Sequence, residues 1–480
     1  MKKFIIGLTI FLAIVVVGLQ VAYSYAYLAP DSFTYFTMAR QVYDSGQLFS
    51  FSGVDHTTGI HPGFYFFLIP FYYFFSINLP AGSLILGALL LAGAVLLLGD
   101  IFGLGAAVIF ALGFLTPYGL TLANSGMESS LAVLSLSIVI FIIVKNKIFK
   151  LPLPLNYGIA LALGGALGLM VFSRLDLIFV IMSILFSISL SRLIYNGWSL
   201  KNIKFLAIDL FLIFLPITVF LFTAIGLNLI YGGALLPISG ALKSSFPHPS
   251  VNWFNNLLTL KIFVLTAILT FGYLLFYWFK YKKNDWLIFS LWTAVLFLGA
   301  YNALFASGIG AWYGAFPFAV LLLSLILSWR EFGVRLNVWL KSKPILLATF
   351  LSLFAVLLIA ANLIFISSRV DWVLPHAIAA QYLNTLPAGS AGELKDGVFA
   401  FYSKRPVFSL TGLANNEEYV KAVKGGQLRD YFKKHDIAYV VAGSIYSGVQ
   451  VAGHGTDLTL CHQPIYDQGF VAIFKASDCL

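Results

Sequence analysis

Repeated apolar runs are the feature that most constrains how this chain folds. A helix needs about 20 apolar residues to cross the roughly 30 Å hydrocarbon core of a bilayer, and many runs in this 480-residue sequence approach that length. Hydrophobic residues make up 60% of the chain and charged residues 10%. The runs are apolar on all sides, as in helices that face lipid or the interior of a bundle. The sequence therefore predicts an all-α polytopic membrane protein.

We expect eleven transmembrane helices, and their approximate bounds are 4–26, 81–98, 103–121, 129–144, 156–173, 176–191, 205–229, 262–279, 286–305, 312–328 and 344–366. A further apolar stretch, residues 63–79, is only about seventeen residues long, rich in Phe and Tyr, and broken by Pro70. Its length and aromatic content favour an interfacial or re-entrant helix. A cleaved signal peptide is the alternative for the amino terminus, although the first apolar run exceeds the usual 7–15 residues of such a segment.

The distribution of charge predicts the orientation. With a cytoplasmic amino terminus, fifteen basic and three acidic residues fall in the cytoplasmic segments, against four basic and five acidic residues in the membrane-proximal outer loops. Such an excess of Lys and Arg marks the cytoplasmic side. We therefore expect a multi-pass plasma-membrane protein, and the net charge of +10 indicates contact with anionic membrane lipids and not with nucleic acid.

The composition changes near Val370. Residues 370–480 carry nine basic and ten acidic groups in an ordinary globular mixture, which predicts an extracytoplasmic α/β domain after a transmembrane domain over 1–369. The first outer loop of that transmembrane domain covers about 27–80. Within the C-terminal domain we expect helices over 377–386 and 417–434 and strands over 407–410 and 438–442.

The C-terminal domain also contains both cysteines, Cys461 and Cys479. An even number of cysteines outside the cytoplasm permits a disulfide, and the flanking segments 458–461 and 470–474 are candidates for paired strands. Two buried free thiols are the alternative.

Residues 30–62 concentrate polar chemistry in a nearly charge-free protein, because this loop contains Asp31, Arg40, Asp44, Asp55, His56 and His61. The chain has no Walker-type or dinucleotide glycine fingerprint and no CxxC or HExxH spacing, so the sequence does not point to nucleotide or zinc chemistry. The loop follows the first span, which places it on the outer face.

Several segments, taken in order, resemble the motifs of GT-C membrane glycosyltransferases, the superfamily of the protein mannosyltransferases and aminoarabinose transferases. The first outer loop is similar at Asp31-Ser-Phe-Thr-Tyr35-Phe-Thr-Met38-Ala39 and Thr57-Thr-Gly-Ile-His61-Pro62. The later similarities are Ser125-Gly-Met-Glu128, Ser173-Arg174-Leu-Asp176, Leu236-Pro-Ile-Ser-Gly-Ala-Leu-Lys243 and the tail segment Tyr402 to Leu413. Two positions depart from the family pattern: Asp31 stands where many members have paired acids, and Thr411 where the tail motif commonly has Asp.

The resemblance implies a hexosyl- or pentosyltransferase that acts on the outer face. Its donor would be a sugar linked to polyprenyl phosphate, and its acceptor a hydroxyl of a glycan, lipid or protein, with inversion at the sugar. No tightly bound cofactor is implied. Participation of a divalent cation stays open, with Asp55 and His56 as the residues that could contact one.

Each candidate residue has a chemical and a structural reading. Asp31 suits the general base that deprotonates the acceptor, or it caps the helix expected over 33–43. Arg174 and Lys243, two of the four basic residues of the outer loops, suit the departing phosphate. Arg174 has Asp176 as an alternative partner.

His61 and Glu128 are further candidates for substrate binding. His61 could hydrogen-bond phosphate or acceptor, or fix the turn before Pro62. Glu128 could orient sugar hydroxyls, or cap the fourth span. Asp209 lies inside the seventh span, where acids are functional candidates by default.

Two other classes of function compete with the enzyme. A transporter or flippase of lipid-linked sugars would need polar groups through the membrane midplane, whereas the expected spans are nearly free of charge. A membrane anchor for a binding domain would not need so many spans. The sequence therefore favours the glycosyltransferase.

Overall fold

The computed structural model describes residues 2–235, 237, 245–250, 253–282, 284–306, 310–332, 344–394, 397–411, 414–442 and 464–479. The chain divides into two compact units. The first comprises Met1–Tyr23, Leu84–Phe222 and Phe246–Ser368. The second comprises Ser24–Ser83, Thr223–Ser245 and Arg369–Leu480, so it joins the predicted first outer loop to the predicted C-terminal domain.

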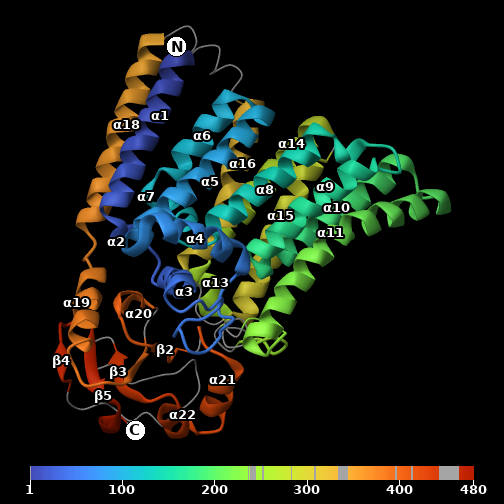
Figure 1. Cartoon of the computed structure of the whole chain (residues 1–480). Helices are drawn as coiled ribbons and strands as arrows, with labels where there is room; N and C mark the ends of the chain where they lie inside the picture. Colours follow the sequence, from blue (N-terminus) through green and yellow to red (C-terminus); the bar gives the residue numbers. More distant parts are fainter. Residues whose placement is uncertain are drawn as a thin grey trace. The chain divides into compact units, whose positions relative to one another are not determined.

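Long apolar helices and the short helices α7 and α13 build the first unit (Figure 1). Their bounds are α1 Lys2–Ala22, α5 Leu79–Phe102, α6 Leu104–Phe114, α7 Pro117–Ala123, α8 Ser129–Lys145, α9 Tyr157–Ser173, α10 Ile178–Asn196, α11 Leu200–Gly232, α13 Trp253–Thr259, α14 Lys261–Tyr281, α15 Trp286–Phe305, α16 Ala315–Phe332 and α18 Pro344–Ser367. Helices α5 and α11 continue into the second unit. Helices α1 and α18, far apart in sequence, lie side by side (Figure 1).

The helices confirm a polytopic membrane protein. Every predicted span contains a helix. In the described part of the chain, nine helical segments are long and apolar enough to cross a membrane, and the pair α6–α7 makes a tenth if it counts as one span. Helix α9 is shorter, with 17 residues. The expected total of eleven therefore stays a prediction.

The span expected over 103–121 is wrong as a single helix, because α6 and α7 meet at an angle of 86°. Pro117 is the cause. A proline has no backbone N–H to continue a helix, and it favours an extended conformation for the residue before it. Thr116, the residue before Pro117, accordingly has ψ 150°. The Thr116 side chain then caps α7 by accepting the Gly119 N–H at 3.0 Å.

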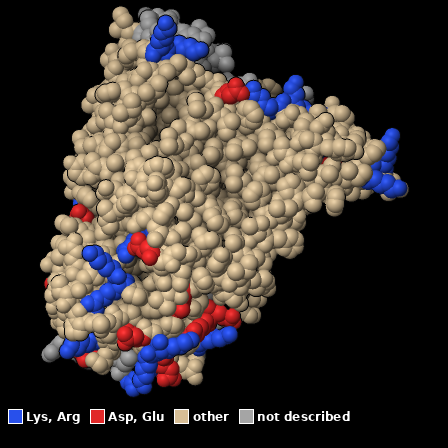
Figure 2. Space-filling view, viewed as in Figure 1, with Lys and Arg blue, Asp and Glu red and all other residues tan. Residues whose placement is uncertain are grey.

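Charged side chains lie at the helix ends of the first unit, and Figure 2 shows broad surfaces without them between these ends. Basic residues stand at the start of α1 and α11 and at the end of α8 and α14, namely Lys2, Lys3, Lys201, Lys204, Lys145 and Lys280. This distribution is typical of helices whose middle faces hydrocarbon.

The second unit begins with short helices from the predicted outer loop: α2 Ser24–Tyr27, α3 Ser32–Asp44 and α4 Pro62–Phe75. Helix α4 occupies most of the stretch 63–79, and Pro70 lies inside it without ending it. A short turn at Ser76–Asn78 separates α4 from α5, and together Pro62–Phe102 form one candidate span.

A five-stranded sheet forms the C-terminal part of the second unit. Its elements are α19 Val373–Leu383, β1 Ser390–Glu393, α20 Val398–Tyr402, β2 Val407–Ser409, α21 Glu417–Lys424, α22 Leu428–Lys434, β3 Ile437–Ala442, β4 Tyr466–Asp467 and β5 Ala472–Lys475. The strand order is β2-β1-β3-β5-β4. Strand β1 is parallel to β2 and β3, and β5 is antiparallel to β3 and β4. The α/β class and both predicted strands are confirmed.

Two details of the C-terminal part differ from expectation. The helix predicted over 417–434 is two helices, α21 and α22, separated at Gly425 and Gly426, where Gly426 has φ +66°. Strand β1, with the sequence Ser-Ala-Gly-Glu, was not predicted because it contains no β-branched or aromatic residue.

Candidate functional site

Asp31 stands at the start of α3. It occupies the N-cap position with helical backbone angles, φ −57° and ψ −18°, and its side chain makes no capping hydrogen bond. Ser32 Oγ instead donates to the Ala29 carbonyl at 2.6 Å. Asp31 is half-buried, whereas the residues from Ser32 to Ala39 are all buried. The capping alternative for Asp31 is therefore not realised.

The two halves of the first-loop motif meet at Tyr35 and His61. Tyr35 lies one helical turn after Asp31, on the same side of α3. Its buried hydroxyl accepts the His61 backbone N–H at 3.1 Å, and its ring packs edge-on against Phe64, with centroids 5.9 Å apart. His61 is the N-cap residue of α4, with Pro62 at the first position. The backbone of His61 thus fixes this turn.

Arg174 lies at the end of α9 in the first unit, 5% exposed. Its Nε and Nη2 donate to the two carboxylate oxygens of Asp176 at 3.0 and 2.7 Å. Its Nη1 stands 3.4 Å from Glu128 Oε1, and the guanidinium lies 4.5 Å from the Tyr313 ring centroid. A bidentate arginine pair of this kind is strong and directional.

This arrangement realises the ion-pair alternative for Arg174. The two carboxylates outnumber the one guanidinium, so these three side chains together carry a net negative charge. Glu128, 1% exposed, stands at the N-cap of α8 and makes no side-chain capping hydrogen bond there. Glu128 is instead one of the charges that Arg174 neutralises.

Replacing Arg174 distinguishes a structural ion pair from a phosphate-binding role. We expect Arg174→Ala to remove the cation from beside the buried Glu128 and the half-buried Asp176 and to cost about 3–5 kcal/mol of folding free energy. Arg174→Lys should recover only part of this, because an ammonium cannot make two parallel hydrogen bonds to Asp176. Thermal unfolding in detergent measures both. A fully stable Arg174→Ala protein with a raised donor KM would instead identify Arg174 as a phosphate ligand.

The candidate residues do not all belong to the same unit. Asp31 and His61 belong to the second unit, and Arg174 and Glu128 to the first, so a common site for them stays a prediction. Lys243 and Cys461 lie outside the described residues. Cys479 is fully buried, and its disulfide with Cys461 stays a prediction.

The contacts of Asp209 explain why an acidic residue stands inside a predicted span. Its Oδ2 accepts a hydrogen bond from Arg192 Nη1 at 2.7 Å, and its Oδ1 accepts the Leu155 N–H at 2.9 Å. Arg192 Nη2 also donates to the Pro152 carbonyl at 2.8 Å, and both charged residues are 0% exposed. The pair therefore ties α10 and α11 to the turn before α9.

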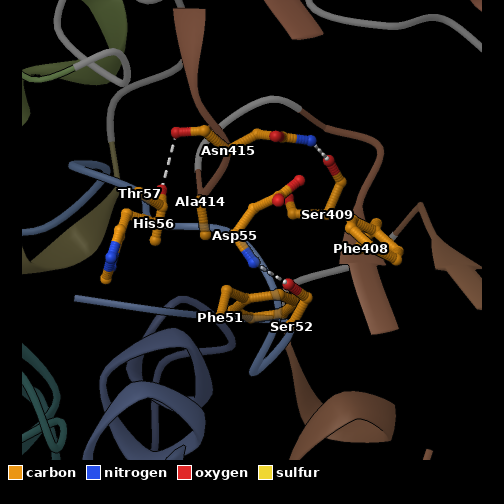
Figure 3. Close-up of a pocket in the computed structure, with 9 residues that line it drawn as sticks. All are labelled: Phe51, Ser52, Asp55, His56, Thr57, Phe408, Ser409, Ala414 and Asn415. Atoms are coloured by element: carbon orange, nitrogen blue, oxygen red, sulfur yellow. Dashed lines mark hydrogen bonds between the residues drawn. The ribbon is translucent and has the colours of Figure 1, made fainter. Parts of the chain in front are cut away.

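A small pocket lies inside the second unit, where the first outer loop meets the C-terminal sheet domain (Figure 3). Its lining residues are Phe51, Ser52, Asp55, His56, Thr57, Phe408, Ser409, Ala414 and Asn415. Thr57 Oγ1 donates to the Asn415 carbonyl at 2.7 Å, and Asn415 Nδ2 donates to the Ser409 carbonyl at 2.8 Å. These polar groups therefore hydrogen-bond to each other.

Asp55, a candidate for cation contact, faces a histidine. Asp55 Oδ2 lies 3.3 Å from Nδ1 of His435, whose side chain is 6% exposed and whose Nε2 lies 3.6 Å from Glu418. Burial alone would raise the pKa of Glu418, but its hydrogen bond to Lys434 and the neighbouring positive charges lower that pKa overall. Across the described ranges, no group of three or more His, Cys, Asp or Glu side chains is arranged to hold a metal.

The chain was compared with protein families, curated proteins and solved structures. No family model and no curated protein matches it. ArnT from Cupriavidus metallidurans bound to undecaprenyl phosphate matches with a TM-score of 0.63 and 14% identity over 99% of both chains. Its apo state matches with a TM-score of 0.58 and 13% identity over 97% of both chains.

The archaeal oligosaccharyltransferase AglB from Archaeoglobus fulgidus, in complex with an inhibitory peptide and a dolichol-phosphate, is also similar. Its TM-score is 0.50 with 12% identity, over 92% of this chain and 69% of AglB. The chain therefore has the GT-C fold over nearly its whole length, as the order of its motifs predicted.

Proposed function

We propose that this protein is a membrane glycosyltransferase that takes its sugar from a polyprenyl-phosphate carrier. The observation that carries the proposal is the shared fold, over 99% of both chains, with ArnT bound to undecaprenyl phosphate. The contact between Tyr35 and the His61 turn supports it, because it joins the two halves of the loop motif that holds Asp31.

The chemistry that we propose needs few groups. The acceptor oxygen attacks the anomeric carbon while the bond from that carbon to the phosphate oxygen breaks, and attack from the opposite side inverts the centre. Asp31 takes the acceptor proton as general base. The phosphate leaves with the electron pair of the broken bond, so a nearby cation stabilises the transition state.

Lys243 is the proposed partner of the departing phosphate. Arg174 was the other candidate, but two carboxylates already surround its guanidinium, which makes it the weaker of the two. We further propose that His61 and Glu128 orient substrate hydroxyls. The reaction is assigned to the extracytoplasmic face, with the amino terminus in the cytoplasm, on the basis of the charge bias.

The test is transfer by purified protein in proteoliposomes. A panel of radiolabelled polyprenyl-phosphate hexoses and pentoses is offered with glycan, lipid and peptide acceptors, and consumption of each donor is followed. We expect one donor class to be consumed with release of polyprenyl phosphate, and the stereochemistry of the product reports inversion. Movement of the labelled lipid across the bilayer without cleavage would favour a flippase and overturn the enzyme.

A further inference from the structure

Helix α20 of the C-terminal sheet domain contacts α3 along one face, and this contact has a consequence for Asp31. We infer that Arg40 is a positioning residue: by fixing α3 to α20, it sets the location of Asp31 at the start of α3. The inference rests on the proposed function, since Asp31 is the general base only in a glycosyltransferase. The contacts themselves lie entirely within the second unit.

The amino-terminal end of α20 is fixed to the sheet. Glu393, the last residue of β1, is 0% exposed. Its Oε1 accepts the Phe399 N–H and its Oε2 accepts the Ala400 N–H, both at 3.1 Å. The first N–H groups of a helix have no partner within the helix, so this buried carboxylate both satisfies α20 and ties it to β1.

The same end of α20 approaches the backbone of α3. Gly397, at the N-cap of α20, has φ +89°, and its carbonyl accepts Thr37 Oγ1 at 3.1 Å. A Cβ at this position would lie 2.9 Å from Thr34 N and 3.0 Å from Phe33 C. Only glycine permits both this backbone angle and this close approach.

The other end of α20 binds Arg40. Arg40 Nη1 donates to the carbonyls of Phe401 and Ser403 at 2.7 and 2.6 Å, with that of Ala400 at 3.4 Å. Its Nε donates to Asp44 at 2.5 Å. The last carbonyls of a helix also lack partners within the helix, and a cation is favourable there. One guanidinium therefore closes this end of α20.

Aromatic packing fills the space between these two polar contacts. Phe33 and Phe36 are fully buried, and their ring centroids lie 5.9 and 6.1 Å from that of Phe401. The residues of α3 that face α20 are spaced three and four apart, as one face of a helix requires. Asp31, the N-cap residue of α3, lies two positions before Phe33, so α20 restrains the helix that begins directly after the proposed base.

A base acts only at hydrogen-bond distance from its proton, and a displacement of about 1 Å can cost on the order of 100-fold in rate. As a positioning residue, Arg40 does not itself contact the substrate. Loss of its contacts with α20 should therefore lower kcat and leave the donor KM nearly unchanged, because the defect concerns the reacting geometry.

The experiment compares Arg40→Gln and Arg40→Lys with Arg429→Gln, which removes an exposed arginine of α22. Hydrogen exchange by mass spectrometry reports on α3, and transfer by full-length protein in proteoliposomes gives kcat per folded molecule. For Arg40→Gln we expect faster exchange over residues 32–44 and a kcat reduced on the order of 100-fold. Arg40→Lys keeps the charge at the carbonyls and should recover part of both.

Gly397→Ala perturbs the same contact from the other end of α20 and keeps the test open if Arg40→Gln does not fold. It should speed exchange over α3 and lower kcat in the same way. Unchanged exchange, or a kcat equal to that of Arg429→Gln, overturns the inference, as does faster exchange with an unchanged kcat. Wild-type protein that transfers no sugar overturns the proposed function instead, and the exchange data still decide whether Arg40 fixes α3.

Discussion

Asp31→Asn is expected to abolish sugar transfer while leaving folded protein. Asparagine has nearly the same shape as aspartate but cannot accept the acceptor proton, and loss of a general base costs about 100- to 10,000-fold. The Asp31 side chain makes no capping hydrogen bond, so we expect asparagine at this position to preserve the start of α3. The measurement is the rate of donor consumption per folded molecule, with thermal unfolding in detergent as the stability readout.

The matched control is Asp430→Asn, which neutralises an exposed carboxylate in the first turn of α22, in the same unit. It should keep both activity and unfolding temperature close to those of the wild type. Full transfer activity in Asp31→Asn would remove Asp31 from the mechanism. Lost activity together with a large drop in unfolding temperature would assign Asp31 a structural role.

Asp209→Ala is expected to destabilise the folded protein strongly. It leaves the Arg192 guanidinium, 0% exposed, without its carboxylate and the Leu155 N–H without its acceptor. Removing one partner of a buried ion pair costs about 3–5 kcal/mol, because an uncompensated charge remains in the interior. We expect a strongly reduced yield of folded protein and early unfolding on heating in detergent.

The pair between Lys145 and Asp100 is the control for Asp209→Ala. Its N–O distance is also 2.7 Å, but the two side chains are 46% and 57% exposed, and exposed pairs contribute at most about 1 kcal/mol. Asp100→Ala should therefore unfold almost as the wild type does. The double variant Arg192→Met with Asp209→Leu removes both charges and should recover much of the loss. Equal stability of Asp209→Ala and Asp100→Ala would contradict a structural role for the buried pair.

The tail motif shows why a family resemblance does not identify a chemical role. Arg405, the arginine of the segment that resembles R-P-V, donates to the carbonyls of Leu386 and Pro387, just after α19. It organises the turn that leads into β1. Thr411, which departs from the motif, forms a hydrogen bond of 3.0 Å between its Oγ1 and Ser409 Oγ. Both positions therefore serve the folding of the sheet domain.

Arg40 and Glu393 were not assigned a role from the sequence, and only for Arg40 did the sequence contain a usable pattern. Arg40 was noted only as one charge of the polar loop, although its spacing from Phe33 and Phe36 places all three on one face of a helix. Glu393 gave no signal, because nothing local distinguishes a buried carboxylate from an exposed one. Its partners Phe399 and Ala400 follow it closely, but the turn that brings them together was not predicted.

The sequence alone determined the membrane class, the helices of the predicted spans and the α/β class of the C-terminal part, and it nominated Asp31 as the base that we propose. These depend on local quantities: the transfer free energy of each apolar segment, the period of its side chains and the order of short motifs. Only the tertiary structure decided what Arg174, Asp209 and Arg40 contact. Thr37 and Gly397, for example, are 360 residues apart in the chain. The partner of a buried polar side chain depends on which distant segment packs against it, and no local pattern encodes that.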